Sequence, residues 1–562
     1  MFLCFILFFL FCAGRLFFIQ VFRSNYLAII AKKQHNLFVE LEPRRGTIYD
    51  SNLKPLAVNM QVDSLFACPN GMSFKDRETA AKKISAILGL NISQLRERLN
   101  RKKYFVWLAR KITPQQSAEI RKLNIKGLDF IKESKRCYPD GYLASHVLGF
   151  AGLDNTGLEG LELYYDSYLK GEAGWAMFLR DARQKKLDLW EKMVLPKDGY
   201  DLVLTIDEVI QYIAERELDK AYRKYNAKGA SIVVLDPRTG AVLALANRPT
   251  YDLNESTSVS RDIRRNRLIT DMFEPGSVFK IVTASGALEE KKVDEKVKIF
   301  CENGAYKVSS HVLHDHRPHG WLTFREVIEQ SSNIGTSKVA QMLGNDLLYK
   351  YIRLFGFGAK LGIDLPGEIS GVARPPRFWS KVSVATIPMG HEIGVTTLQL
   401  AGEISIIANG GRLMKPYIVS EVRDKFGETI KQFSPVEINR VMSENTAERI
   451  KKILVGVIEE GTGKLAKVMG FDAAGKTGTA QKLEPNGRYS HNKYVASFIG
   501  FAPADEPLIA VAVTLDEPHP YYFGGVVAAP VFKGVANDAI RYLKTRQLPE
   551  EISVSHEINP VN

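Results

Sequence analysis

Three short motifs, well separated along the 562-residue chain, contain the residue types that serine acyl transfer requires. They are Ser277-Val-Phe-Lys280, Ser331-Ser-Asn333 and Lys476-Thr-Gly478. On a helix, a serine three residues before a lysine shares a face with it, about one turn away. A serine hydroxyl attacks poorly without a neighbouring base, and lysine is such a base only when burial or a second cation lowers its pKa. Lys476 is a candidate for that second cation.

The residues around Ser277 predict that it lies at the start of a helix. Glu274-Pro-Gly276 is a helix-opening turn, and apolar residues follow at helical spacing at Phe279, Ile281, Val282 and Leu288. Backbone N–H groups at a helix N-terminus favour developing negative charge. A lone Ser-x-x-Lys is most often a solvated surface pair. Three motifs in this order, with gaps of 54 and 145 residues, are instead the set of penicillin-binding proteins and class A β-lactamases.

Over nearly its whole length the chain resembles the class B penicillin-binding proteins, monofunctional transpeptidases of peptidoglycan synthesis. The segments similar to that family are Arg44-Arg-Gly-Thr-Ile-Tyr-Asp50, Arg136-Cys-Tyr-Pro139 with His146 and Gly149, Gly157-Leu-Glu-Gly-Leu-Glu162, Leu204-Thr-Ile-Asp207, Phe498-Ile-Gly-Phe-Ala-Pro503, Tyr522-Phe-Gly-Gly525 and Ala528-Ala-Pro530. Ser51-Asn-Leu53 departs from the family pattern. Glu274-Pro-Gly-Ser277 and Ser331-Ser-Asn333 resemble the septal, cell-division branch more than the elongation branch.

The resemblance implies a multi-domain α/β fold. We expect an N-terminal transmembrane helix, an elongated α+β pedestal, and a serine β-lactamase/transpeptidase-like domain with an antiparallel sheet flanked by helices. We place the transmembrane anchor at residues 1–22, the dimerisation or pedestal domain at 23–200, the transpeptidase domain at 201–548 and a C-terminal tail at 549–562.

Local patterns predict several elements of these domains. Ala80 to Leu99 and Pro114 to Leu123 are expected to be amphipathic helices, and Asp207 to Tyr222 a helix capped by Thr205 or Asp207. Residues 231–235 with 241–245, and residues 495–501 with 508–515, are expected to form two hairpins. Residues 526–543 are expected to close the chain as a helix.

The resemblance also assigns roles to matching residues. The catalytic residues are Ser277, Lys280, Ser331, Asn333 and Lys476; the substrate-binding residues are Thr477, Gly478 and Thr479. The implied reaction is acyl transfer from the D-Ala-D-Ala end of a peptidoglycan stem peptide, with residual carboxypeptidase activity and with acylation by β-lactams. No metal or cofactor is implied.

The implied partners are peptidoglycan stem peptides and nascent glycan strands, β-lactam antibiotics, a SEDS-family glycosyltransferase and other membrane proteins of the division machinery. The implied location is the cytoplasmic (inner) membrane, crossed once, with the catalytic domain on the extracytoplasmic or periplasmic side. Nucleic acid is not expected, because no Lys/Arg run interleaved with aromatics indicates a binding groove. The net charge of +13 favours an anionic membrane surface or an acidic wall polymer over nucleic acid.

Other functions remain open from the sequence. A β-lactamase would need a deacylating Glu, and Glu368-Ile-Ser-Gly371 lacks the Leu-Asn that follows it in class A enzymes. A β-lactam sensor would need a cytoplasmic output module, and none is visible. The chain could also be an elongation-type transpeptidase, or a β-lactam-binding scaffold for a SEDS-family glycosyltransferase.

The N-terminal 22 residues are almost wholly apolar and, as a helix, would span about 33 Å, enough to cross a bilayer core. A cleaved signal peptide is disfavoured because no small-x-small site follows. No Lys or Arg precedes the apolar run, whereas Arg15, Arg23, Lys32 and Lys33 lie within or after it, and this charge bias opposes an extracytoplasmic enzyme domain. We therefore expect a basic segment upstream of Met1, which mass spectrometry of the intact native protein would reveal or refute.

Two further patterns favour ordinary structural roles. His311, His314, His316 and His319 could suggest zinc, but we expect them in a non-metal loop between a strand and a helix. Val457 to Lys464 resembles a phosphate loop only loosely, because Ile458 and Leu465 replace its Gly and its Ser or Thr. A helix end followed by a turn is the better interpretation there. The five cysteines are too few and scattered for a disulfide framework.

Overall fold

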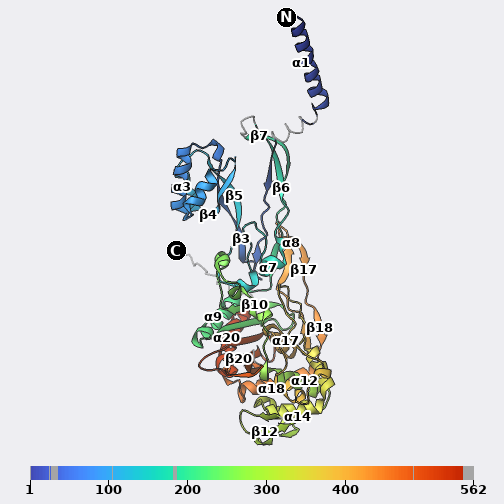
Figure 1. Cartoon of the computed structure of the whole chain (residues 1–562). Coiled ribbons are helices and arrows are strands. Elements are labelled where there is room, and N and C mark those ends of the chain that lie inside the picture. The colour runs from blue at the N-terminus through green and yellow to red at the C-terminus, as the bar shows by residue number, and fades with distance from the viewer. Residues whose placement is uncertain are drawn as a thin grey trace, which may run out of the picture. The chain divides into compact units, whose positions relative to one another are not determined.

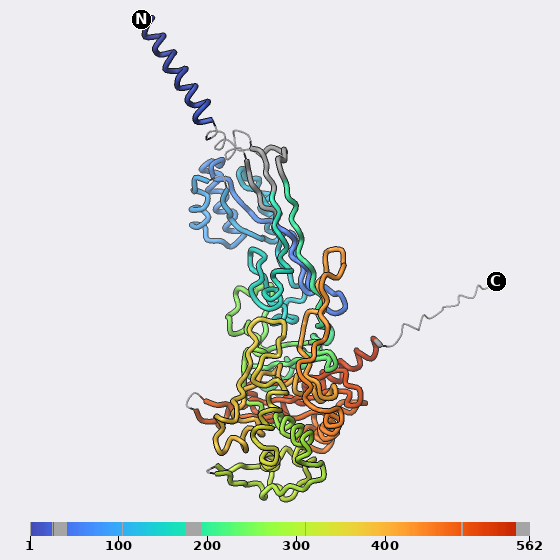
Figure 2. Tube along the Cα trace, turned by 90° about the vertical axis from the view of Figure 1, so that its right-hand side faces the viewer, coloured from blue at the N-terminus to red at the C-terminus, as the bar shows by residue number. Residues whose placement is uncertain are grey.

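The computed structural model describes residues 2–24, 26, 36–103, 105–180, 186–309, 311–484 and 487–547 (Figures 1 and 2). The predicted tail at 549–562 lies outside these residues. The chain forms two compact units: residues 1–46, 59–136 and 167–200 make the first, and residues 47–58, 137–166 and 201–562 the second. The domain boundaries expected from the sequence stay predictions.

Helix α1 (Phe2–Phe22) is the one described helix that is long and apolar enough to cross a membrane. Its 21 residues have a mean hydropathy of 2.5, and none of that span is buried by the rest of the protein. At 1.5 Å per residue it is about 31 Å long, close to the hydrocarbon thickness of a bilayer. The predicted N-terminal apolar helix is therefore confirmed as a helix, and it fits a single-pass membrane anchor.

The first unit contains a segment with a hydrophobic core of its own, residues 59–136, which we call the head. It holds the end of β3 (Pro55–Ala67), then η1 (Pro69–Gly71), α3 (Phe74–Leu88), α4 (Ile92–Leu99), β4 (Val106–Ile112), α5 (Pro114–Lys122) and β5 (Leu128–Cys137). The core includes Leu65, Ile84, Leu95, Leu108 and Ile120. Elsewhere in this unit, β1 (Asn36–Leu41), β6 (Gly174–Arg180) and β7 (Lys186–Val194) form an antiparallel sheet.

The expectation of one helix from Ala80 to Leu99 is wrong. Gly89 ends α3 with a φ of +66°, a left-handed conformation that glycine adopts without a Cβ penalty. Asn91 then starts α4, its side chain accepting from the backbone N–H groups of Ser93 and Gln94. The expected helix at 114–123 is confirmed as α5, which begins with a capping box between Thr113 and Gln116.

The second unit is built on a five-stranded antiparallel sheet in the order β10-β9-β21-β20-β19. The strands are β9 (Gly229–Leu235), β10 (Val242–Arg248), β19 (Ala474–Leu483), β20 (Tyr489–Ala502) and β21 (Ile509–Asp516). Both predicted hairpins are confirmed: β9 pairs with β10, and β20 pairs with β21. Strand β19, which carries Lys476-Thr-Gly478, is at an edge of the sheet.

Helices cover both faces of this sheet (Figure 1). On one face α9 (Glu208–Lys224) and α20 (Ala529–Gln547) pack on a core that includes Ile232, Phe498, Val511 and Phe532. Helix α17 (Thr397–Ala408) packs on the other face. Helix α18 (Glu444–Glu459) packs on α17 and on α12 (Lys280–Glu289), and α12 in turn packs on α14 (Asn333–Leu343) and α15 (Asn345–Leu354). The expected antiparallel sheet flanked by helices is confirmed.

The structure shows where the helices of three predicted segments begin or end. Asp207 caps α9, accepting from the N–H groups of Val209 and Ile210, as expected, whereas the Thr205 hydroxyl donates to the carbonyl of Val242 instead. The closing helix is interrupted at Ala528, so that a short α19 (Gly524–Val527) precedes α20. Helix α18 ends at Glu459 and a turn follows, as expected for the segment that resembled a phosphate loop.

Candidate active site

Ser277 lies in the first helical turn before α12, as the sequence predicted. A 3-10 turn, η3 (Gly276–Phe279), leads directly into α12, which begins at Lys280. Gly276 has a φ of +61°, and a Cβ there would lie 2.9 Å from the carbonyl oxygen of Thr479. Glycine is therefore required where the turn meets strand β19. Ser277 is half-buried and faces a cleft.

Lys280 joins the first motif to the second. Its side chain is fully buried. Its Nζ donates to the Ser331 carbonyl oxygen at 2.6 Å, to the Ser331 Oγ at 3.1 Å and to the Asn333 Oδ1 at 2.7 Å. Three acceptors from one segment fix the position of this amine, because a buried lysine must satisfy its donors inside the protein.

Lys476, in the third motif, also contacts the Ser331 hydroxyl. It lies on β19 and is also fully buried. Its Nζ donates to the Ser331 Oγ at 3.0 Å and to the Thr477 carbonyl oxygen at 3.3 Å. The Ser331 Oγ therefore lies within hydrogen-bond distance of two lysine amines, and three motifs that are far apart in sequence meet at one atom.

This arrangement lowers the pKa of both lysines. Burial lowers the pKa of Lys280 well below its usual value, the nearby charge of Lys476 lowers it further, and the carboxylate of Asp315 opposes both effects. Burial lowers the pKa of Lys476 to about 7. Desolvation and a like charge both favour the neutral amine. Lys280 can therefore be a proton acceptor at neutral pH, which the sequence could only suggest.

Asp315 supports the second motif and was not predicted from the sequence. Its carboxylate accepts from the Asn333 N–H at 2.5 Å, the Ile334 N–H at 3.0 Å and the Ser332 hydroxyl at 2.6 Å. These bonds satisfy the first N–H groups of α14. The carbonyl oxygen of His314 accepts from the Asn333 Nδ2 at 2.9 Å. The Asn333 side chain, which accepts a hydrogen bond from Lys280, is thus fixed in position by the His314 carbonyl.

The expectation of a loop between a strand and a helix is wrong for two of the four histidines. His311 and His314 lie on strand β13 (His311–His314), which pairs with β12 (Ala305–Val308) in a hairpin. His316 and His319 follow the hairpin and line the cleft. Within the described residues, no group of three or more His, Cys, Asp and Glu side chains is arranged to hold a metal ion.

The third motif forms one wall of the cleft. Thr477 shares a hydrogen bond of 2.8 Å with the Thr462 hydroxyl, and the Thr479 Oγ1 accepts from the Gly524 N–H at 3.0 Å. A Cβ on Gly478 would lie 2.3 Å from the Ser497 Oγ and 2.9 Å from the Pro275 carbonyl oxygen. Any side chain at this position would therefore push the strand away from the turn that carries Ser277.

These elements enclose a cleft of about 710 Å³. Its lining includes six of the eight predicted residues: Ser277, Ser331, Asn333, Thr477, Gly478 and Thr479. Lys280 and Lys476 are absent from the lining because both are buried behind it. Aromatic side chains form part of the lining, with the Tyr494 and Tyr522 rings stacked at 4.1 Å and Phe523 beside them. The cleft thus offers a hydroxyl nucleophile, two amines and room for a peptide.

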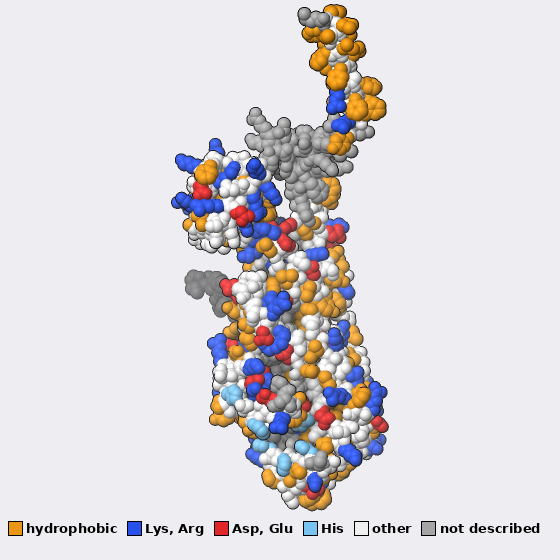
Figure 3. Space-filling view, in the orientation of Figure 1, with side chains coloured by type: hydrophobic (Ala, Val, Ile, Leu, Met, Phe, Trp, Pro, Cys, Tyr) orange, Lys and Arg blue, Asp and Glu red, His pale blue; other side chains and the backbone are white. Residues whose placement is uncertain are grey.

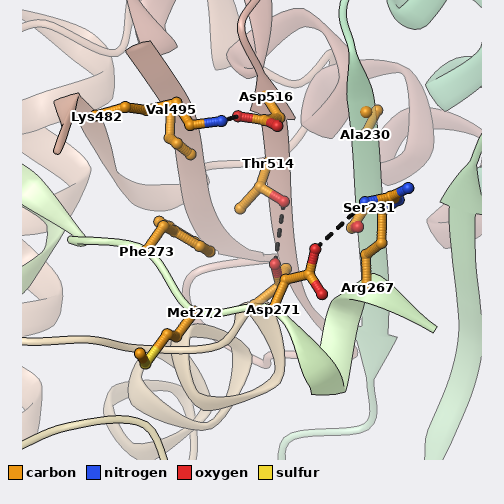
Figure 4. Close-up of a pocket in the computed structure, with 12 residues that line it drawn as sticks. Ala230, Ser231, Arg267, Asp271, Met272, Phe273, Lys482, Val495, Thr514 and Asp516 are labelled. Atoms are coloured by element: carbon orange, nitrogen blue, oxygen red, sulfur yellow. Dashed lines mark hydrogen bonds and ion pairs between the residues drawn. The ribbon is translucent and has the colours of Figure 1, made fainter. Parts of the chain in front are cut away.

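A second pocket, of about 130 Å³, lies beside the sheet and has a different character (Figure 4). Its charged side chains pair with each other: Lys482 with Asp516 at 2.7 Å, and Arg267 with Asp271 at 3.4 Å. The Thr397 and Thr514 hydroxyls are likewise 3.0 Å apart. Because its polar groups are satisfied internally and it holds none of the motif residues, this pocket is not the reaction site.

A serine at a helix start with two buried lysines behind it, on a helix-covered antiparallel sheet, defines a serine acyltransferase of the penicillin-recognising class. Comparison with known families agrees. The family model described as "Penicillin binding protein transpeptidase domain" matches residues 230–537, and the "Penicillin-binding Protein dimerisation domain" matches residues 40–204.

Individual proteins and structures are similar along most of the chain. Stage V sporulation protein D of Bacillus subtilis is 38% identical over 560 residues, covering 98% of this chain and 86% of that protein. The peptidoglycan D,D-transpeptidase FtsI of Escherichia coli K12 is 32% identical over 548 residues, covering 96% and 90%. Penicillin-binding protein 3 of Mycobacterium tuberculosis, solved with aztreonam, has a TM-score of 0.70 at 29% identity, covering 91% of this chain and 97% of that one.

The chain therefore belongs to the penicillin-binding proteins, and its pairing of a dimerisation domain with a transpeptidase domain is that of class B.

Replacing Lys476 should move the pH dependence of acylation to higher pH. The charge of Lys476 lowers the pKa of Lys280, so Lys476→Met should raise that pKa, and neutral Lys280 should then appear only at higher pH. We expect the acidic limb of the acylation-rate profile to shift upward and the maximal rate to fall about 100-fold. Stopped-flow labelling with fluorescent penicillin across pH measures both. An acidic limb at the same pH as in the wild type would contradict the electrostatic coupling between Lys476 and Lys280.

Replacing Asp315 should move the acidic limb of the acylation-rate profile to lower pH, opposite to the effect of replacing Lys476. The Asp315 carboxylate raises the pKa of Lys280, so Asp315→Asn should lower it, and the acidic limb should shift to lower pH. Asparagine still accepts N–H bonds at the start of α14, so the fold should survive, while a less firmly held Asn333 should slow acylation about tenfold. The same labelling assay tests this. An unshifted or upward-shifted limb would contradict the electrostatic coupling of Asp315 to Lys280, and an unchanged rate would contradict its positioning of Asn333.

Proposed function

We propose that this protein is a peptidoglycan D,D-transpeptidase that cross-links stem peptides through a serine acyl-enzyme. The observation that carries the proposal is the Ser331 hydroxyl within reach of both the Lys280 and Lys476 amines, beside a cleft that contains Ser277. This geometry supplies a nucleophile, a proton acceptor and a route for returning the proton, which acyl transfer from a peptide requires.

In the first half-reaction, the Ser277 Oγ attacks the carbonyl carbon of the penultimate D-Ala, and Lys280 accepts the hydroxyl proton. The backbone N–H groups of Ser277 and Thr479 stabilise the oxyanion, an effect worth several kcal/mol in comparable sites. The peptide bond to the terminal D-Ala then breaks. Its nitrogen receives a proton through Ser331, and D-Ala leaves while the rest of the donor stays as an ester on Ser277.

In the second half-reaction, the amine of a neighbouring stem peptide attacks this ester. A new peptide bond forms, the bond to the Ser277 Oγ breaks, and the serine recovers its proton. Water in place of the amine would release a shortened peptide, which is the residual carboxypeptidase reaction. A β-lactam would acylate Ser277 in the same way and leave a slowly released ester.

The remaining motif residues bind the donor. Thr477 and Thr479, with the positive field of Lys476, bind the terminal carboxylate, and Asn333 hydrogen-bonds the donor peptide while it holds Lys280. Gly478 lets the backbone of the edge strand approach the acyl group. These roles follow the family pattern, and the positions of these side chains in the cleft lining support them.

The position of Glu368 argues against a β-lactamase. Its Oε1 accepts from the Leu361 N–H at 2.7 Å, and its Oε2 accepts from the Gly362 N–H at 3.0 Å. It is not among the residues that line the cleft. A carboxylate committed to backbone groups in this way does not activate water at an ester of Ser277, so hydrolysis of the acyl-enzyme should be slow.

For cellular role, we propose an enzyme held in the cytoplasmic membrane by α1, with its catalytic unit outside the cytoplasm, that acts at the division septum with a SEDS-family glycosyltransferase and other division proteins. The Glu274-Pro-Gly-Ser277 and Ser331-Ser-Asn333 motifs and the similarity to FtsI support the septal assignment. The alternatives are an elongation-type transpeptidase and a β-lactam-binding scaffold for the glycosyltransferase.

Fluorescent penicillin and a Ser277→Ala variant test the chemistry. The full-length wild-type protein should bind about one label per chain and release it over hours, because Glu368 is bound to backbone N–H groups and does not line the cleft, and Ser277→Ala should bind none. Rapid release would mean a hydrolase. Labelling that persists in the variant would mean that another residue is the nucleophile.

The same variant tests the cellular role. In cells depleted of the native protein, wild-type chain should restore division, whereas cells that carry only Ser277→Ala should grow as filaments. Rounded cells would instead indicate the elongation role, and normal division with Ser277→Ala would indicate a scaffold. Immunoblotting for equal protein level in the membrane fraction is the control.

A further inference from the structure

The positive charge of this protein is concentrated in the head. Residues 59–136 contain 17 Lys and Arg against seven Asp and Glu, a net charge of +10 out of +13 for the whole chain. In Figure 3, Lys and Arg side chains predominate over acidic ones on the visible face of the head, around α3 and β4. The proposed reaction takes place in the other unit and uses none of these residues.

Part of this charge gathers where three backbone segments meet at one end of the head. The Cys68 N–H donates to the Gly127 carbonyl at 2.7 Å, and the Asn70 N–H donates to the Lys103 carbonyl at 3.3 Å. These bonds place the η1 turn beside the segment before β4 and the segment before β5. Lys102, Lys103 and Lys126 are at or beside these contacts, and Phe74 and Lys75 start α3 just after η1, following Met72, whose side chain lies against Gly127. We call Phe74, Lys75, Lys102, Lys103 and Lys126 the basic tip.

The basic tip is exposed, and its lysines are not ion-paired, with Asp76 and Asp129 as the acidic residues near it. All four lysines are exposed, and none has an ion-pair partner among the described residues. Several other cations of the head are paired: Arg96 with Glu78, Arg101 with Glu97, and Arg121 and Lys132 with Asp63. The exposed Lys82, Lys83, Lys122 and Lys135 are unpaired among the described residues, as the tip lysines are, so the gathering of lysines beside Phe74 is what distinguishes the tip. Phe74, the first residue of α3, is 74% exposed and places an apolar ring beside these charges.

We propose that the basic tip docks on the surface of an anionic phospholipid bilayer. Lysine ammonium groups attract lipid phosphates, each strengthening binding by about fivefold near an anionic surface, and an exposed phenyl ring gains by entering the interface between headgroups and acyl chains. Helix α1 lies in the same chain and fits a membrane anchor. A tether raises the effective concentration of the tip at the membrane, so a modest intrinsic affinity is sufficient.

Phe74 distinguishes a membrane from other polyanions. A soluble wall polymer offers phosphate or carboxylate groups to the lysines but no apolar phase for the ring. Nucleic acid would favour aromatic rings that are free to stack on bases along a basic groove. Phe105, near Lys103, is 41% exposed, but its ring already stacks on Phe66 and packs edge-on against Trp107, which leaves Phe74 as the unpacked ring of the tip. A lipid interface uses both features, because the headgroups take the charge and the acyl boundary takes the ring.

Hydrogen–deuterium exchange on the full-length protein in lipid nanodiscs tests the proposal. Exchange at residues 68–75, 101–103 and 126–128 should slow about fivefold in discs with about 30% phosphatidylglycerol relative to pure phosphatidylcholine. Raising NaCl from about 0.15 M to about 0.5 M should remove most of this protection, because salt screens the attraction. Equal exchange in the two lipids would overturn the proposal.

Matched variants assign the effect to the basic tip. Replacing Lys75, Lys102, Lys103 and Lys126 by Gln should abolish the lipid-dependent protection, and Phe74→Ser should weaken it at least about twofold. Replacing the exposed Lys292, Lys296, Lys298 and Lys381 of the other unit by Gln should change nothing in the head. Protection that survives the first quadruple change would refute docking through the tip.

Two further measurements test whether the partner is instead a soluble acidic polymer and whether the variants still fold. If soluble poly(glycerol phosphate) protects the tip in phosphatidylcholine discs while phosphatidylglycerol does not, the partner is an acidic polymer and the membrane proposal is wrong. Penicillin labelling of each variant reports the catalytic unit, and it should equal wild type. Exchange at the core of the head, around Ile84, Leu95 and Leu108, should also equal wild type in phosphatidylcholine discs, which shows that the head of each variant is folded. Loss of lipid-dependent protection with a normal core and normal labelling would therefore come from the tip and not from failure of the proposed enzyme site.

Discussion

Two lysine amines held out of water at one serine hydroxyl are the constraint on which the rest of this site depends. Moving an ammonium group into a protein interior costs several kcal/mol even after relaxation, and two close together cannot both stay charged. The protein removes this conflict by lowering the pKa of Lys280 most strongly and that of Lys476 to about 7. In the proposed mechanism one amine acts as a base while the other supplies positive field, and burial and proximity account for this division of roles.

This constraint sets the backbone around it. Ser331 has a φ of +61°, an unfavourable conformation for a residue with a Cβ, and it places both the carbonyl and the hydroxyl of one residue on Lys280. Strand β19 approaches the Ser277 turn so closely that Gly276 and Gly478 admit no side chain. Asp315 holds the start of α14 against the same lysine. Close approach therefore restricts which residues fit around the two lysines. Small changes in those residues should alter proton transfer at the site.

The sequence predicted the features that local patterns encode, and it missed those that depend on long-range contact. The Ser277 helix, the hairpins of the main sheet and the cap at Asp207 follow from turn residues and alternation over a few positions. Asp315 was missed because its role depends on a hairpin that brings it to α14, and no local spacing signals that contact. The end of α3 at Gly89 was also missed, because apolar periodicity continues across the break. The basic tip unites lysines spread from 75 to 126, which only the folded head brings together.

The same site geometry explains why an amine is favoured over water in the second half-reaction. Once Ser277 is esterified, Lys280 and Ser331 can still accept a proton from a nucleophile that is bound and aligned, and the cleft of about 710 Å³ leaves room for a second peptide. Water can transfer a proton to the same groups, but it gains no further base from Glu368, whose carboxylate is occupied by the backbone of residues 361 and 362. Binding energy from the rest of the acceptor peptide aligns its amine, and water lacks that energy. The cleft can therefore favour an acceptor amine over water by binding the acceptor peptide. No group that excludes water is required.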